Sequence, residues 1–313
     1  MNIKHKSNNK KTNKGLEILR FYLSFSVVAS HSFIPSKNYK YINLLINNIH
    51  VPIFYIMSFY FFYKTLITRN IEKLIKRFQR LLIPYFIWPI IFFIINKLLN
   101  YIFKINIFIS VKKLKNQLLT GTSFNPALWF QFNLILETFI FIFIEFLFNK
   151  YKSFILINIE LSCYFAQYSY FNYQLFRELN FEMKYPFGRI AESLPYSISG
   201  FMLAHFSFIS YLNKNTLKSI YILIFILLLV IKYNIFLNIM GFNYSGIKIQ
   251  IISLCIFIIF SIIPINKIIK DDINFINQIS KFSSGIYYLH FPVISYLERY
   301  IVLITKILYF IIK

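Results

Sequence analysis

The chain has 313 residues, of which 58% are apolar and only 14% are charged, whereas soluble domains average about 25% charged residues. This composition leaves too many apolar side chains for one soluble core, and it also excludes a disordered chain and a disulfide-rich secreted module. The 34 Lys and Arg exceed the 11 Asp and Glu and give a net charge of +23, which is typical of cytoplasmic loops and anionic-lipid contact, with a polyanionic ligand as the alternative. At roughly 20 residues per span, the sequence predicts an all-α, polytopic transmembrane helical bundle of about 9–10 spans.

The chain begins with a basic segment and continues as a series of apolar segments. Residues 1–14 contain five lysines and predict a disordered cytoplasmic arm, and residues 15–313 are expected to form one membrane-embedded domain. The predicted spans are 16–34, 47–66, 81–103, 127–148, 153–170, 187–208, 216–233, 247–265 and 282–304. The loop at 67–80 holds five Lys and Arg and the loop at 35–46 holds two, so the N-terminus is predicted to be cytoplasmic.

Composition also limits the cofactors and partners. The cations are dispersed among the spans, so we expect membrane lipid and no nucleic acid as a partner. Cys163 and Cys255 lie in apolar segments and are interpreted as packing residues, with no metal site and no disulfide framework expected.

The first span carries ionisable residues in the otherwise apolar stretch GLEILRFYLSFSVVASHSF. Arg20 and His31 are 11 positions apart, so both lie on one helix face, about 16 Å apart along the axis. Glu17 precedes Arg20 by three residues and is expected to pair with it. Lipid penalises an ionisable group at its centre by about 2.5–3.5 kcal/mol, so this stripe predicts a protein-lined cavity. The alternative is an arginine that reaches the membrane surface and a histidine hydrogen-bonded for packing.

The segment KRFQRLLIPYFIW at 76–88 leads into the third span. Arg77 and Arg80 are three apart, which makes them neighbours on one helix face at its cytoplasmic end. Two guanidinium groups suit phosphate oxygens, and a topology anchor that binds lipid headgroups is the alternative. Pro84 is expected in the first turn of the helix, where it sets the helix start or introduces a kink.

Later segments supply further candidates for substrate binding. Trp129, in ALWFQFNLILE, is expected at a membrane boundary, where an aromatic-belt role is the alternative. The segment SSGIYYLHFPV places Ser284, Tyr287 and His290 within two turns of the last span.

Charged residues inside the middle spans are also candidates, because an ionisable group in a membrane is a functional suspect by default. Glu137 and Glu145 are eight apart, close to one helix face, and could line the path of an acceptor substrate. Arg189 and Glu192 are three apart and predict an internal ion pair.

Taken in order, these segments resemble the acyltransferase-3 family of multispanning membrane acyltransferases. The matching features are an Arg, ten residues and a His in the first span, an Arg-x-x-Arg before a Pro-Tyr, a Leu-Trp-Phe, and a late Ser-x-x-Tyr-x-x-His. Residues 150–270 match loosely. The chain departs from the family in having Glu17 where an Asp is frequent, and Phe59 after Ser58 where a Gly is usual.

The resemblance implies an integral membrane O-acyltransferase with a cavity open to the cytoplasm. Such an enzyme moves an acetyl or other short acyl group from cytoplasmic acetyl-CoA or another acyl-CoA to a hydroxyl of a cell-surface or exported glycan, such as a polysaccharide, or of a glycolipid such as lipopolysaccharide. The bacterial inner membrane is the expected location. The resemblance also implies that Arg20 and His31, together with Glu17, form the catalytic group and that Arg77 and Arg80 bind the donor.

A hydroxyl is a weak nucleophile until a base takes its proton, so His31 is the expected base, and a covalent acyl-imidazole is the rival mechanism. Buried Arg, His and Glu serve transport equally well. A transporter or flippase for a glycan or acylated substrate is therefore the alternative function, and a structural subunit of a polysaccharide assembly complex is a third.

Overall fold

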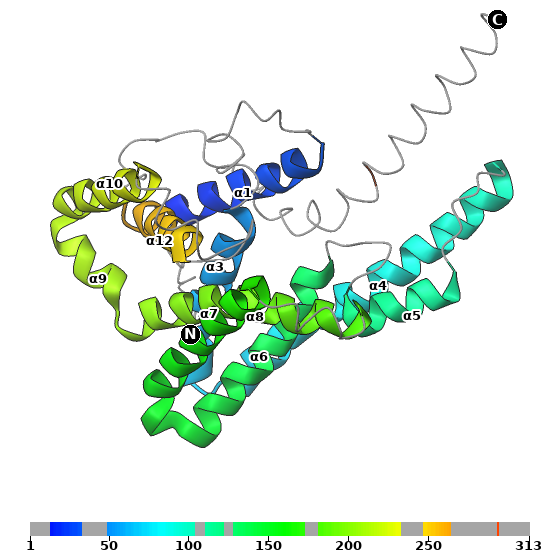
Figure 1. Cartoon of the computed structure of the whole chain (residues 1–313), viewed down its shortest axis with the longest axis horizontal. Coiled ribbons are helices and arrows are strands. Elements are labelled where there is room, and N and C mark those ends of the chain that lie inside the picture. The colour runs from blue at the N-terminus through cyan, green and yellow to red at the C-terminus, as the bar shows by residue number, and fades with distance from the viewer. Residues whose placement is uncertain are drawn as a thin grey trace, which may run out of the picture.

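The computed structural model of the protein describes residues 13–32, 49–103, 110–121, 128–172, 181–232 and 247–263, together with Val293. These residues are almost entirely helical, and no β-strand occurs among them. The predicted all-α fold is therefore confirmed. Figure 1 shows a group of packed helices from which α4 and α5 extend to one side.

Eight long helices are described, and they coincide in order with eight of the nine predicted spans. They are α1 (Lys14–Ser32), α3 (His50–Ile67), α4 (Ile71–Phe103), α6 (Leu128–Phe148), α7 (Lys152–Asn172), α8 (Phe181–His205), α10 (Thr216–Lys232) and α12 (Ile247–Ile262). The ninth predicted span, 282–304, lies outside the described residues apart from Val293. Two short helices, α5 (Val111–Thr120) and α9 (Phe208–Leu212), complete the set in the described part of the chain.

The outer helices present apolar side chains to their surroundings. Three segments are long and apolar enough to cross a membrane, namely Ile71–Leu98, Leu128–Ala166 and Phe208–Val230. The first and third bury only 22% and 17% of their apolar windows inside the protein, against 56% for the second. Exposed Ile, Leu and Phe side chains on α4 and α10 would be costly in water and are stable against lipid. The chain is a helical membrane protein.

α4 differs from the prediction at its start. The prediction of a loop at 67–80 is wrong, because α4 begins at Ile71 and only a short turn separates it from α3. Asn70 stabilises this early start, since its side-chain oxygen accepts a hydrogen bond of 2.9 Å from the backbone N–H of Lys73. Pro84 and Pro89 consequently lie inside the helix and not in its first turn. Gln131 of α6 donates to the carbonyl of Leu81, in the turn that Pro84 disrupts.

One other local expectation changes. α5 occupies part of the segment between α4 and α6 that carried no predicted helix. Its N-cap Ser110 accepts a hydrogen bond of 3.2 Å from the N–H of Lys113, and its C-cap Gly121 has a left-handed φ of 70°. His50 falls within the predicted span 47–66, and it is the first residue of α3 and is buried.

α3 lies at the centre of the helix packing and has its most extensive contact with α8. Gly200 of α8 permits this contact, because a Cβ at that position would lie 2.2 Å from the carbonyl oxygen of Ile56. A larger residue would push the two backbones apart. In the resulting core, the Phe141 ring of α6 packs at a tilt against Phe59 of α3 and Phe201 of α8, with ring centroids 4.6 and 4.9 Å apart.

The helix directions follow from pairs of contacting residues. α3, α8 and α12 run in the same direction, because residue numbers increase together along their contacting pairs. These pairs are Ile56–Gly200, Tyr63–His205, Ser199–Gln250 and Tyr60–Phe257. α1 runs the opposite way. Asn13, just before its start, donates a hydrogen bond of 2.8 Å to Ser261 near the end of α12, and Arg20 then reaches Met57 in the middle of α3. α1 therefore proceeds toward the N-terminal end of α3.

Candidate functional site

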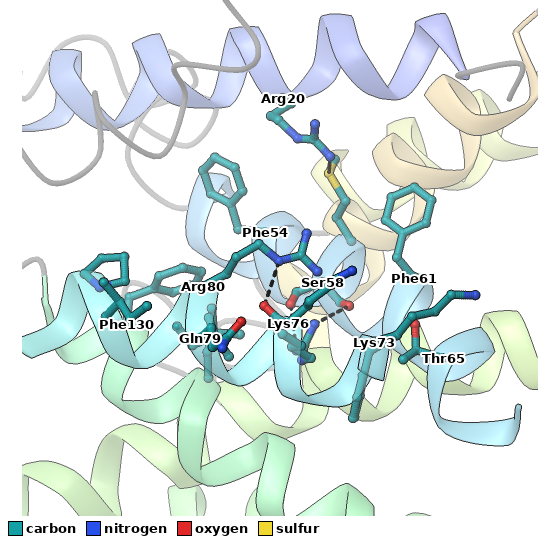
Figure 2. Close-up of a pocket in the computed structure, with 17 residues that line it drawn as sticks. Arg20, Phe54, Ser58, Phe61, Thr65, Lys73, Lys76, Gln79, Arg80 and Phe130 are labelled. Atoms are coloured by element: carbon teal, nitrogen blue, oxygen red, sulfur yellow. Dashed lines mark hydrogen bonds between the residues drawn. The ribbon is translucent and has the colours of Figure 1, made fainter. Parts of the chain in front are cut away.

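A groove of about 1040 Å³ is formed by α1, α3, α4 and α6. Five cationic side chains line it: Arg20, Lys73, Lys76, Arg77 and Arg80. Figure 2 shows Arg20 reaching in from α1 while the other cations come from α4 on the opposite wall. The three arginines that the sequence analysis selected, on two different spans, thus meet at one cavity.

The lining of the groove changes from cationic to apolar along its length. Near the turn between α3 and α4 the lining combines Lys73 and Lys76 with Thr65 and the aromatic ring of Phe61. Beyond Arg80, α4 contributes the apolar residues Ile83 and Pro84, and Phe130 of α6 lines the same end. Lys73 and Phe130 accordingly lie at opposite ends of the view in Figure 2. This gradient suits an elongated ligand with an anionic end and an apolar end.

Arg77 of α4 is held by side chains of two other helices, α3 and α6. Its Nη2 donates to Ser58 Oγ at 3.1 Å on α3, and its Nε donates to Thr138 Oγ1 at 3.2 Å on α6. The guanidinium carbon lies 4.2 Å from the ring centroid of Phe62 and 5.2 Å from that of Phe59. A cation over two rings with two hydroxyl partners is fixed in orientation.

Arg80 has a different environment, although it lies only three residues further along α4. Its side chain is exposed, and the hydrogen bond described for it runs from Nε to the carbonyl of Lys76 at 3.1 Å. The terminal nitrogens of the Arg80 guanidinium have no partner among the described residues. One guanidinium is therefore a fixed part of the wall, and the other presents free donors to the groove.

Arg20 lines the groove as half of an ion pair. Its Nη1 lies 3.1 Å from Glu17 Oε2, which confirms the predicted pair, and its Nη2 lies 3.9 Å from Met57 Sδ. His31 belongs to the last turn of α1, about 16 Å beyond Arg20 along the axis. Its side chain lies outside the described part of the structure. Given the direction of α1, the backbone of His31 lies toward the N-terminal end of α3, the side on which the groove is apolar.

Comparison with known families identifies the family of the chain. Residues 13–312 match the family model described as an acyltransferase domain, which is that of the acyltransferase-3 family. The chain belongs to the acyltransferase-3 family. No curated protein and no solved structure gives a significant match. The family and the apolar helices together establish a membrane acyltransferase.

Among the remaining candidates of this acyltransferase that the structure describes, neither Trp129 nor Glu137 lines the groove. Trp129 does not line the groove, although the next residue, Phe130, does. The Trp129 ring instead lies 4.9 Å from the guanidinium carbon of Arg189, which is paired with Glu192 at 2.7 Å, as the spacing in sequence predicted. Three candidates lie outside the described residues: Ser284, Tyr287 and His290.

Glu137 lies outside the groove lining and is fully buried between α6 and α8. One carboxylate oxygen accepts a hydrogen bond of 2.5 Å from Ser193, and the other accepts from Ser197. Asn133 also donates to Ser193 at 3.2 Å. We call these four residues the α6–α8 seam. Glu145, the other carboxylate expected on this face of α6, is paired with Lys152 of α7 at 3.0 Å.

Sequence reasoning missed the partners of Arg77. Ser58 entered the sequence analysis only as the residue before Phe59 and was not connected to Arg77, and Thr138 was not considered. The local spacing of residues does not predict that α3, α4 and α6 meet at Arg77. Lys73 was counted only as a loop cation, although its spacing from Lys76 and Arg80 places all three on one helix face once the helix is extended to Ile71.

Proposed function

We propose that this membrane acyltransferase moves an acetyl or other short acyl group from acyl-CoA to a hydroxyl of a cell-surface or exported glycan or glycolipid. The observation that carries the proposal is the groove, in which the cations of α4 end at Arg80 and the apolar residues Ile83 and Pro84 follow. CoA has a polyanionic nucleotide at one end and an acylated pantetheine arm at the other. The lining therefore favours a donor with its phosphates near Arg80 and its acyl group beyond Pro84.

The proposed orientation places the groove's cationic end at the cytoplasm, where acyl-CoA is found, with the N-terminus on the same side. The basic segment before α1 and the cations of α4 support this orientation. We place the enzyme in the bacterial cell membrane on the same grounds, together with the family's association with exported glycans.

In the proposed reaction, His31 takes the proton of the acceptor hydroxyl as its oxygen attacks the thioester carbonyl. A carbon–oxygen bond forms, the carbon–sulfur bond breaks, and the proton passes from the imidazole to the departing thiolate, so that CoA leaves as a thiol. Arg20, paired with Glu17, lines the path between the phosphates and His31. In the rival mechanism the imidazole itself carries the acyl group between two transfers.

The test is transfer of radiolabelled acetyl from acetyl-CoA to glycan by the purified protein in proteoliposomes. We expect labelled glycan and stoichiometric release of CoA from the wild type, and no transfer by His31→Ala. His205→Ala is the control, because His205 is bonded to Tyr63 and lies outside the groove lining.

Two results would contradict the proposal. Turnover by His31→Ala near the wild-type rate would show that His31 is not the base. Movement of glycan across the membrane without CoA release would indicate a transporter. Single-turnover trapping of acylated protein without acceptor would replace direct attack by the acyl-imidazole mechanism.

A further inference from the structure

The cations of α4 form a row along one face of the helix. Lys73 and Arg80 are seven residues apart, which is two turns, so their side chains leave the same face about 10 Å apart along the axis. Lys76 and Arg77 lie between them, and all four line the groove. The row begins at the turn between α3 and α4 and ends where the groove becomes apolar.

Only the two ends of this row have uncommitted charge within the described part of the structure. Lys76 is paired with Glu72, and the guanidinium of Arg77 is held by Ser58 and Thr138. The ammonium group of Lys73 has no ion-pair or hydrogen-bond partner among the described residues. The free donors of the row are therefore Lys73 Nζ and the terminal nitrogens of Arg80.

We propose that Lys73 and Arg80 are a two-point site for the separate phosphate groups of the CoA donor, with Lys73 binding the 3′-phosphate and Arg80 the 5′-diphosphate. This inference rests on the proposed function, since it names the donor contacts of the same groove. Arg77 is then a positioning residue, which holds α4 against α3 and α6 so that its neighbours face the ligand. The sequence motif Arg-x-x-Arg thus divides into one binding and one positioning residue.

The orientation of CoA within the groove follows from the order of its covalently linked parts. The pantetheine arm leaves from the diphosphate, so the diphosphate must lie nearer the apolar part of the groove than the 3′-phosphate does. Arg80 is adjacent to that part and Lys73 is at the opposite end. A guanidinium fork suits the several oxygens of a diphosphate, whereas an ammonium group is a point charge that suits a terminal monophosphate.

The experiment measures the dissociation constants of CoA and of dephospho-CoA, which lacks only the 3′-phosphate, by calorimetry. The full-length protein is held in nanodiscs of phosphatidylcholine, so that no anionic headgroup competes. Lys73→Gln is expected to bind CoA about tenfold more weakly than the wild type and dephospho-CoA equally well. Arg80→Gln is expected to weaken both ligands. Lys97→Gln is the matched control, because Lys97 is an exposed lysine of the same helix outside the groove lining.

The outcomes separate this inference from the proposed function. If Lys73→Gln binds CoA as tightly as Lys97→Gln does, or loses both ligands equally, the assignment of the 3′-phosphate to Lys73 is wrong while the donor proposal stands. If the wild type binds neither CoA nor dephospho-CoA, both proposals fail. A second arm adds phosphatidylglycerol to the nanodiscs. If this lipid displaces both CoA and dephospho-CoA from the wild type but displaces neither from Lys73→Gln, Lys73 binds a lipid headgroup and the inference is overturned.

Discussion

The groove and the α6–α8 seam both place polar groups inside an apolar helical protein, yet they differ in how those groups are paired. In the seam, both carboxylate oxygens of Glu137 accept hydrogen bonds from Ser193 and Ser197, and the cluster is closed. In the groove, Lys73 and Arg80 line an open volume, and their terminal nitrogens have no hydrogen-bond partner in the part of the chain that the structure describes. A self-satisfied buried cluster stabilises helix packing, whereas unpaired charge at an accessible cavity is suited to a ligand. An ionisable residue within a span is therefore not by itself a site residue.

Arg77 connects the two regions. Its guanidinium lines the groove, and its Nε donates to Thr138, the residue after Glu137. The wall that presents Arg80 to a ligand is thus attached to the seam through one side chain. Changes at Arg77 should disturb both regions, and changes on either side of it should disturb only one.

The largest effect is expected from Arg77→Ala. The substitution removes hydrogen bonds to Ser58 and Thr138 and the contact with the ring of Phe62. We expect a loss of about 3 kcal/mol in the free energy of unfolding, because charged hydrogen bonds contribute about 1.5–3 kcal/mol each. Donor affinity should fall as well, since α4 loses its attachment to α3. Thermal unfolding in detergent and calorimetry with CoA measure the two effects.

The neighbouring variant Arg80→Ala is the control for that prediction. Arg80 is exposed and bonds only to a carbonyl of its own helix among the described residues. Its loss should change stability by less than about 0.5 kcal/mol while weakening CoA binding. Equal destabilisation by the two variants would show that the two arginines are equivalent, contrary to the structure.

Glu137→Gln tests the seam with an intermediate expected effect. A glutamine side chain has one carbonyl oxygen where the carboxylate has two acceptors, so either Ser193 or Ser197 loses its partner. We expect a destabilisation of about 1–3 kcal/mol, measured by thermal unfolding, with CoA affinity unchanged in the folded protein. A variant of normal stability that no longer transfers acyl groups would instead assign Glu137 to the substrate path.

Glu17→Gln is also expected to change stability only slightly. The ion pair of Glu17 with Arg20 is partly exposed, with side-chain exposures of 18% and 31%, and such pairs contribute less than about 1 kcal/mol. Its consequence should be functional, because it releases the Arg20 guanidinium that lines the groove. The dissociation constant of CoA should tighten slightly while kcat for transfer falls. If neither changes in steady-state kinetics, the pair has no role in the site.

Local sequence spacing accounted for much of what the structure contains. The positions of eight helices followed from runs of apolar residues, and the segment 153–170, despite its Glu160 and serines, is helical in α7 as predicted. The pairs Glu17–Arg20 and Arg189–Glu192 followed from a separation of three residues. The errors occurred where capping outweighed hydropathy, as at Asn70, which lets α4 begin before its apolar part.

The sequence by itself determined that this protein is a helical membrane protein, where its long apolar helices lie and which family it resembles. Composition, apolar length and motif order can all be read along the chain without knowledge of the fold. Only the tertiary structure decided that Arg77 is held by Ser58 and Thr138, whereas the terminal nitrogens of Arg80 have no partner within the described ranges. It likewise decided that both carboxylate oxygens of Glu137 accept hydrogen bonds from serines of α8. Those partners come from helices distant in sequence. Their meeting depends on close approaches such as that of Gly200 to Ile56, which no local pattern encodes.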